Sequence, residues 1–86
     1  MSVKIRLKRF GTRGRPFYRL IVIDTRAARD GRAIEEVGLY HPIEREEEQQ
    51  IRLKEDRIKS WLRRGAQPSP TVRRLLNKRD VYVSRT

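Results

Sequence analysis

Residues 3–24, VKIRLKRFGTRGRPFYRLIVID, contain two strand-like runs on either side of a short polar loop. In the first run the apolar residues Val3, Ile5 and Leu7 alternate with cations. A period of two places the apolar side chains on one face of a sheet and the cations on the other. The second run, LIVI at 20–23, has no polar alternation and predicts a central strand that is covered on both faces. Together the two runs predict a sheet with one strongly basic face.

Turn signals divide the first half of the chain into strands and connections. Strands are expected at about 3–9, 17–23 and 33–40. Phe10 and Gly11 are expected to end the first strand, whereas Val37 and Leu39 are expected to share one face of the third. The acidic segment 44–50 is expected to form an exposed loop or a short helical turn, at a distance from any phosphate partner.

Two amphipathic helices are predicted after a short edge strand at 51–53. The first helix spans about 54–64, and Gly65 follows where a left-handed residue commonly ends a helix. The second begins with Ser69 as N-cap and Pro70 at the first helical position. This order predicts an α+β fold: a small mixed or antiparallel sheet of three to five strands with two C-terminal helices packed on one face.

The size and charge of the chain bound what it can do. At 86 residues it is expected to form one domain, 1–86, with 79–86 as a short C-terminal tail. The net charge is +11, and residues 1–32 hold ten cations against two anions. Seventeen of the 22 cations are arginines, whose planar fork suits phosphate. A solvated cationic face is one interpretation, but the clustering and the aromatic residues within it favour nucleic-acid binding.

Several classes of protein are disfavoured by the sequence. The chain has no cysteine and a single histidine, His41, which argues against thiolate metal sites, other metal centres and histidine-based catalysis. It has no apolar run of the roughly 20 residues that span a bilayer, and no signal-peptide pattern at its N-terminus. We therefore expect a cytoplasmic protein with no membrane, cofactor or small-molecule substrate and no homo-oligomer.

Two other functions remain as alternatives. A nuclease would use carboxylates such as Asp24, Asp30, Glu35 and Glu36, although each of them can instead pair with a nearby arginine or belong to a turn. A free-standing regulator would need a recognition helix, but the helix that opens at Ser69 offers few base-reading side chains in its first turn. No enzymatic activity is expected.

The candidate RNA-binding residues come from the basic strand, its loop, the start of the second strand and the turn between the helices. Phe17 and Tyr18 alternate faces, so one is expected in the core and the other is available for stacking. The arginines of the helix turn are equally well interpreted as solvated helix faces. The set is Lys4, Arg6, Lys8, Arg9, Arg13, Arg15, Tyr18, Arg19, Arg63, Arg64, Arg73 and Arg74.

The motifs KIRLKRFG, PFYR, RDGRAIEEVGLYHP and GAQPSPTV occur in an order and spacing that resemble the S-sixteen family of the bacterial and organellar small ribosomal subunit, over roughly residues 2–78. The resemblance implies a mixed sheet with two helices, no enzymatic role, and neighbouring ribosomal proteins as partners. It also implies binding to the backbone and folded shape of small-subunit ribosomal RNA, in its 5′ domain, during subunit assembly. Carried over by position, it adds Arg26, Arg29 and Arg32 to the RNA-facing set.

Overall fold

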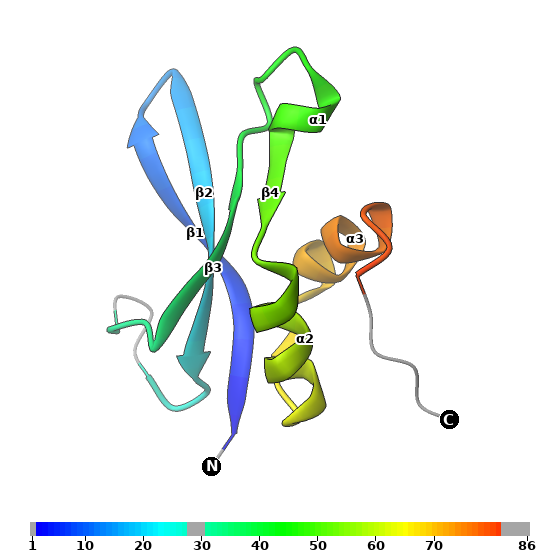
Figure 1. Ribbon diagram of the computed structural model, residues 1–86. Helices are drawn as coiled ribbons and strands as arrows, with labels where there is room; N and C mark the ends of the chain where they lie inside the picture. The colour runs from blue at the N-terminus through cyan, green and yellow to red at the C-terminus, as the bar shows by residue number, and fades with distance from the viewer. Residues whose placement is uncertain (1, 28–30, 82–86) are drawn as a thin grey trace.

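The computed structural model describes residues 2–27 and 31–81 of the chain. A curled sheet forms one layer and two helices form the other (Figure 1). The elements are β1 (Val3–Thr12), β2 (Arg15–Asp24), β3 (Glu35–Tyr40), α1 (Glu47–Gln50), β4 (Ile51–Leu53), α2 (Glu55–Arg63), β5 (Gln67–Pro68) and α3 (Pro70–Lys78). Within the described ranges the strands form one five-stranded sheet in the order β4-β3-β2-β1-β5. Its β1–β5 pair is parallel and its other pairs are antiparallel, which confirms the predicted mixed α+β fold.

The strands β1 and β2 form one long antiparallel hairpin. Their pairing continues to Thr12 and Arg15, so only two residues make the turn. The prediction that Phe10 and Gly11 end the first strand is wrong, because Gly11 remains paired with Pro16. Gly11 has a φ of +89°, a left-handed conformation that glycine adopts without steric cost. The hairpin therefore reaches further beyond the core than its sequence pattern indicates.

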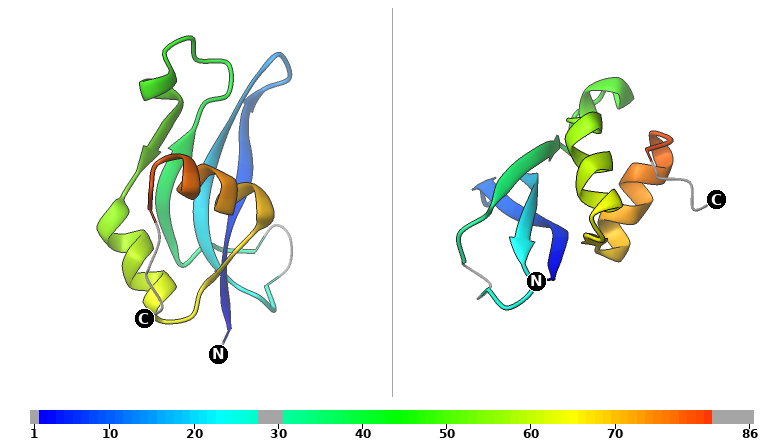
Figure 2. Two further views of the ribbon diagram at one scale, coloured as in Figure 1. Left: turned by 90° about the vertical axis from the view of Figure 1, so that its right-hand side faces the viewer. Right: turned by 60° about the horizontal axis from the view of Figure 1, so that its bottom comes forward.

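The hydrophobic core lies between the sheet and the two C-terminal helices (Figure 2). Ile5, Leu20 and Val22 of the sheet are fully buried and share one cluster with Ile58 of α2 and Val72 of α3. Burial of a side chain of this size stabilises the fold by about 1.5–3 kcal/mol. The apolar positions of β1 therefore face the helices, as their alternation predicts.

The central strand β2 is buried on both faces, which confirms the interpretation of its apolar run. Ile21 is 3% exposed and Ile23 is 0% exposed, although both alternate with the residues that face the helices. In the register, Arg6 lies beside Ile21 and Lys4 lies beside Ile23. Long cationic side chains cover apolar surface with their stems and keep their charges in water. The charged groups on this side of the sheet thus lie above a layer of buried apolar side chains.

A β-bulge changes which residues of β3 face the core. The register between β2 and β3 shifts between Leu20 and Ile21, so strict alternation fails there. Val37 is fully buried in the core, and Tyr40 packs against the same cluster. Leu39 instead pairs with Arg19, on the opposite side of the sheet. The prediction that Val37 and Leu39 share a face is therefore wrong.

The ends of the two C-terminal helices follow their sequence signals. Gly65 has a φ of +93°, and its N–H donates to the carbonyl of Leu62 at 3.0 Å just after α2. Ser69 is the N-cap of α3, and its Oγ accepts a hydrogen bond from the Val72 N–H at 3.3 Å. Both predicted boundaries are confirmed to within a residue or two.

The sheet includes one strand that the sequence did not predict. Gln67 and Pro68 form β5, which pairs in parallel with β1, and the N–H of Ser69 then donates to the carbonyl of Ile5 at 3.0 Å. A strand of two residues is too short to show a period of two, and the proline it contains weakens any strand signal further. This pairing fixes the start of α3 against β1.

The acidic segment 44–50 ends in the short helix α1, as expected, and β4 follows it as an edge strand. Its contacts join it to the end of α3. Arg79 Nη2 donates to the carbonyl of Glu47 at 2.7 Å, and Lys78 Nζ lies 3.2 Å from Glu47 Oε1. These cations are therefore engaged with the acidic segment on the helix side of the molecule.

The chain turns back towards the core after α3. Asp80 has a φ of +56°, and the next N–H, that of Val81, donates to the carbonyl of Leu76 at 2.8 Å. Val81 is 1% exposed and belongs to the core cluster. The predicted tail, 79–86, thus begins as a docked segment, and residues 82–86 lie outside the described residues.

Candidate nucleic-acid interface

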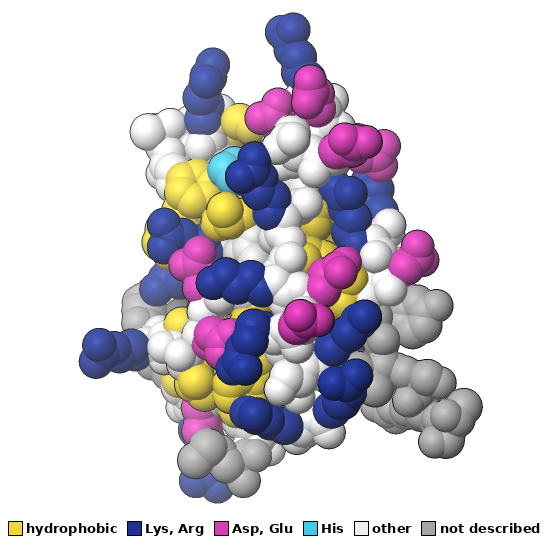
Figure 3. Space-filling model, viewed as in Figure 1, with side chains coloured by type: hydrophobic (Ala, Val, Ile, Leu, Met, Phe, Trp, Pro, Cys, Tyr) yellow, Lys and Arg dark blue, Asp and Glu magenta, His cyan; other side chains and the backbone are white. Residues whose placement is uncertain are grey.

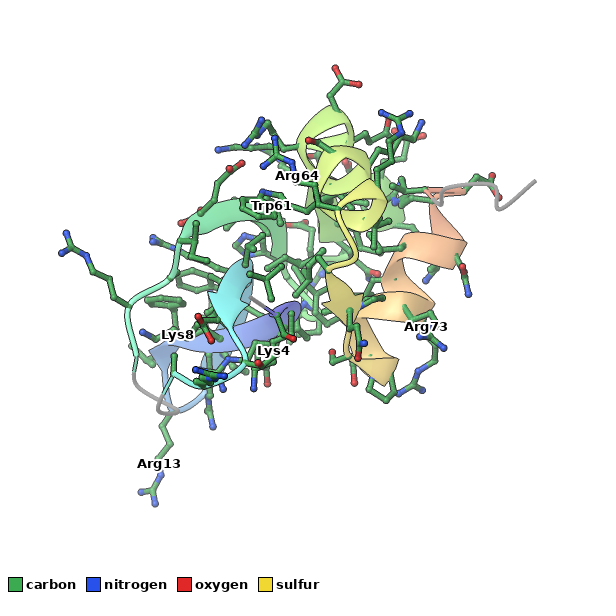
Figure 4. The ribbon with its side chains drawn as sticks, turned by 90° about the horizontal axis from the view of Figure 1, so that it is seen from below. Lys4, Lys8, Arg13, Trp61, Arg64 and Arg73 are labelled. Atoms are coloured by element: carbon green, nitrogen blue, oxygen red, sulfur yellow. The ribbon has the colours of Figure 1, made fainter. Side chains whose placement is uncertain are left out.

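Three of the four cations of β1 lie on the sheet face that is turned away from α2 and α3. Lys4, Arg6 and Lys8 alternate with Ile5 and Leu7, which pack on the core side. Figure 4 shows Lys4 and Lys8 along β1, away from α3. Positions two apart on a strand are separated by roughly 6.7 Å. We call this side of β1 and β2, with Lys4, Arg6, Lys8 and Arg19, the basic face.

The hairpin tip, residues 12–15, carries two further candidates. Arg13 and Arg15 are exposed, and Arg13 projects away from the body of the molecule (Figure 4). A β-carbon added at Gly14 would meet no atom within 4 Å among the described residues, so the tip is open on that side. The tip therefore offers two guanidinium groups that a large partner can reach.

Arg19 is held in place on the basic face by two contacts. Its Nη1 donates to Glu36 Oε2 at 3.1 Å, and its guanidinium carbon lies 4.5 Å from the ring centre of Phe10. The side chain is still 41% exposed. Arg19 is thus oriented by a carboxylate and an aromatic ring, while part of its fork stays in contact with solvent.

Three aromatic rings of this side of the sheet stack in a row. Phe10 pairs with Phe17 across the hairpin, with ring centres 5.7 Å apart, and Phe17 stacks on His41 at 5.2 Å. We call Phe10, Phe17 and His41 the ring row. The sequence did not single out Phe10 or His41 for stacking. Only the strand register could have identified them: Tyr18 pairs with Tyr40, so Phe17, which precedes Tyr18, lies beside His41, which follows Tyr40.

The structure also decides which of the two adjacent aromatics lies on the basic face. Phe17 is on that face, whereas Tyr18 stacks on Tyr40 at 6.0 Å on the side that faces the helices. Arg9 pairs with Tyr18 and so lies on that same side, exposed beyond the end of the core. A role for Tyr18 and Arg9 in RNA binding stays a prediction, and they are not part of the basic face.

The connection between β2 and β3 lies at the end of the sheet opposite the hairpin tip (Figure 1). Arg26 and Arg32 are exposed there, and the N–H of Arg26 donates to Asp24 Oδ1 at 2.8 Å in a local turn. Arg29, the third candidate of this segment, lies outside the described residues. The predicted contacts would therefore extend along the full length of the hairpin.

The four arginines of the helix turn form a separate group. Arg63, Arg64, Arg73 and Arg74 are all exposed, and the guanidinium carbon of Arg64 lies 5.0 Å from the ring centre of Trp61. Figure 4 shows Arg64 and Arg73 on the helix layer, apart from Lys4 and Lys8. A single flat surface therefore does not include both groups, and a role for these four arginines in RNA binding stays a prediction.

The carboxylates that a nuclease would use have structural partners. Asp24 accepts from a turn N–H and Glu36 pairs with Arg19. Glu35 accepts two hydrogen bonds from Arg57, at 2.6 and 2.8 Å, and one from the Trp61 indole at 3.2 Å. The hydrogen bonds from Arg57 are the largest cause that lowers the pKa of Glu35 from 4.5 to about 2. Asp30 lies outside the described residues.

The described part of the chain holds neither a cluster of metal ligands nor a helix that could span a membrane. In the described ranges no three His, Asp or Glu side chains gather as the ligands of a metal ion would. No helix of those ranges combines the length and apolar character needed to cross a membrane. A small α+β chain whose sheet carries a row of cations and stacked rings on its open side is typical of nucleic-acid-binding proteins.

Comparison with known proteins defines the family. The family model of ribosomal protein S16 matches residues 9–69. The small ribosomal subunit protein bS16 of Treponema denticola is 58% identical over 81 residues, which cover 94% of this chain and 99% of that protein. The bS16 protein of Borrelia hermsii is 52% identical over 83 residues, or 96% of this chain and 98% of that protein. The chain belongs to the ribosomal protein S16 family, in agreement with the resemblance seen in its motifs.

Proposed function

We propose that the chain is a structural constituent of the small ribosomal subunit that binds small-subunit ribosomal RNA, in its 5′ domain, and supports assembly. Membership of a ribosomal structural protein family, which is not an enzyme family, supports the first part. The observation that carries RNA binding is the row of Lys4, Arg6 and Lys8 on the open side of a rigid sheet. The ribosome, in the cytoplasm, is the proposed location.

The mechanism is one of charge and geometry. Phosphate contacts position a protein on a nucleic acid, and the shape of a folded RNA brings together phosphates from several segments. The hairpin is paired along its whole length, so the spacing of its cations is fixed before the RNA arrives. Binding then pays little conformational entropy for the backbone of the interface. The hairpin tip and the 25–32 connection extend the same contact at either end.

A second contact is proposed for the helix layer. Its exposed cations, Arg63, Arg64, Arg73 and Arg74, are well placed for another RNA segment or a neighbouring small-subunit protein. Segment 44–50, which ends in α1, carries exposed glutamates and is joined to the end of α3. Figure 3 shows these acidic side chains gathered away from the hairpin. We propose that this acidic part lies away from the phosphates.

Binding to a transcript of the 5′ domain of small-subunit RNA tests the proposal. If about six phosphates are engaged, the logarithm of the association constant should fall against the logarithm of salt concentration with a slope of about −4 to −5. Nearly salt-independent binding would contradict a phosphate-based interface. Co-sedimentation separates the proposal from a regulator, which would stay off small subunits at moderate salt. Metal-dependent cleavage of the RNA that Asp24→Asn abolishes would instead favour the nuclease.

A further inference from the structure

The ring row has the geometry of an offset aromatic stack. Phe10 and Phe17 are inclined by 21° and Phe17 and His41 by 11°, with ring centres 5.7 and 5.2 Å apart. Nearly parallel rings at these separations are offset-stacked, which is a favoured arrangement of aromatic pairs. The row crosses the ends of three neighbouring parts of the sheet, from β1 through β2 to the residue that follows β3. It is thus a rigid feature of the outer half of the hairpin.

The rings of this row are not used to build the core. The core cluster of the described residues includes Tyr40 and Trp61 among its partly buried members but none of the three rings of the row. All three are half-buried on the side of the sheet that neither α2 nor α3 covers. Figure 3 shows hydrophobic side chains around the histidine at the molecular surface. Three half-buried rings that lie outside the core of so polar a chain indicate an interaction surface.

The charges around the ring row match a nucleic acid. Arg19 lies 4.5 Å and Lys8 Nζ 5.8 Å from the ring centre of Phe10. The same hairpin carries two more exposed cations, Arg13 and Arg15, at its tip. Proteins that bind single-stranded nucleic acid combine rings that stack on bases with neighbouring cations that contact the phosphates. An apolar protein segment would use the rings but would leave the cations without partners.

We infer that the ring row binds an unpaired nucleotide of the RNA, whose base stacks on an end of the row, while the basic face holds the flanking phosphates. The inference rests on the proposed function and specifies which kind of RNA element this face reads. A base inside an A-form duplex is covered by its neighbours and cannot be reached from the deep groove. A bulged or loop nucleotide exposes its base, so the contact selects a position where the RNA helix is interrupted.

The test measures how Phe17→Leu changes binding to the 5′-domain transcript over a range of salt concentrations. Phe17 is the middle ring and stacks on both Phe10 and His41, so its loss should displace the end ring that carries the base and weaken binding by about 5- to 150-fold. The salt slope should stay at the wild-type value, because no phosphate contact is lost. Phe17→Tyr keeps the ring and should bind like the wild type. Tyr40→Leu removes a half-buried ring from the opposite side of the sheet and is the matched control, with affinity near that of the wild type.

Each other outcome overturns the inference in a distinct way. If the wild type binds the transcript and Phe17→Leu binds equally well, the ring row does not contact RNA, and the proposed function stands. If Phe17→Leu also lowers the salt slope, as loss of a phosphate contact would, the change acts on the cations through the hairpin. If RNA affinity is kept but the variant fails to enter small subunits, the rings contact a protein. If the wild type does not bind the transcript, the proposed function fails first.

Discussion

Replacing Glu35 by glutamine tests how the helix layer is attached to the sheet. Glu35 opens β3, and its two carboxylate oxygens accept from the Nε and Nη2 of Arg57 on α2 at 2.8 and 2.6 Å. Its Oε1 also accepts from the Trp61 indole at 3.2 Å. Glutamine has nearly the same shape but carries no charge and can accept through only one oxygen. The substitution therefore removes the charge-assisted fork and leaves the surrounding packing in place.

The size of the effect follows from the pKa of Glu35. A lowering from 4.5 to about 2 would correspond to about 3 kcal/mol of stability at neutral pH if it were realised in full. The side chain of Arg57 is 47% exposed, and water screens an ion pair that is this accessible. We therefore expect Glu35→Gln to lower the free energy of unfolding by about 1–2 kcal/mol at pH 7.

The effect should depend on pH in one direction. The pKa of Glu35 is lower in the folded protein than in the unfolded chain, so its contribution is complete above about pH 4.5. It is lost as the pH falls towards the folded pKa of about 2. The difference between wild type and Glu35→Gln should thus shrink between pH 7 and pH 2.5. Urea unfolding followed by the fluorescence of Trp61, the only tryptophan of the chain, measures it at each pH.

Glu36→Gln is the matched control for this experiment. It changes the net charge by the same amount in the neighbouring residue, and it removes the Arg19–Glu36 pair, whose side chains are 41% and 40% exposed. A pair this accessible contributes about 0–1 kcal/mol. Equal losses for the two variants at pH 7, or a Glu35→Gln deficit that does not change with pH, would refute the reasoning.

Three further predictions concern the hairpin and the N-cap of α3. Gly11→Ala should lower the free energy of unfolding in urea by about 1–3 kcal/mol, because the backbone there is left-handed and a β-carbon would lie 2.5 Å from a backbone oxygen. Gly14→Ala is its control and should be nearly neutral. Ser69→Ala should cost about 1 kcal/mol of stability by removing the N-cap of α3; no loss would show that the Val72 N–H finds another acceptor. Arg13→Gln should make the salt slope of RNA binding shallower by about 1, and Arg45→Gln, in the acidic segment, should leave it unchanged.

The parts of the fold that depend on neighbouring residues alone could be predicted from the sequence. The alternation of Val3, Ile5 and Leu7 with cations determines the faces of β1, because successive side chains of any strand point to opposite sides. The caps at Gly65 and Ser69 are likewise local, since each acts within one helical turn. In all these cases the physical cause lies within a few residues of its effect.

The parts that depend on pairing between distant segments could not be predicted. The bulge between Leu20 and Ile21 in the β2–β3 register places Leu39 on the basic face. The strand β5 exists only because it pairs with the edge of β1. The ring row has the same origin. Phe10 and Phe17 are neighbours because the hairpin register pairs them, and His41 joins them through β3. The sequence showed that the first strands are basic and aromatic, but only the register decided that Phe17, and not Tyr18, lies among the cations.

The two glutamates at the start of β3 connect these results. Glu35 and Glu36 follow each other on the strand, so their side chains leave opposite sides of the sheet. Glu35 binds Arg57 and attaches α2 to the sheet, whereas Glu36 binds Arg19 and fixes it beside the ring row. The chain has a net charge of +11, so each of these carboxylates reduces the repulsion between nearby cations and also positions one arginine. If Arg19 binds RNA as proposed, Glu36→Gln should weaken binding to the 5′-domain transcript, while the free energy of unfolding changes by only about 0–1 kcal/mol.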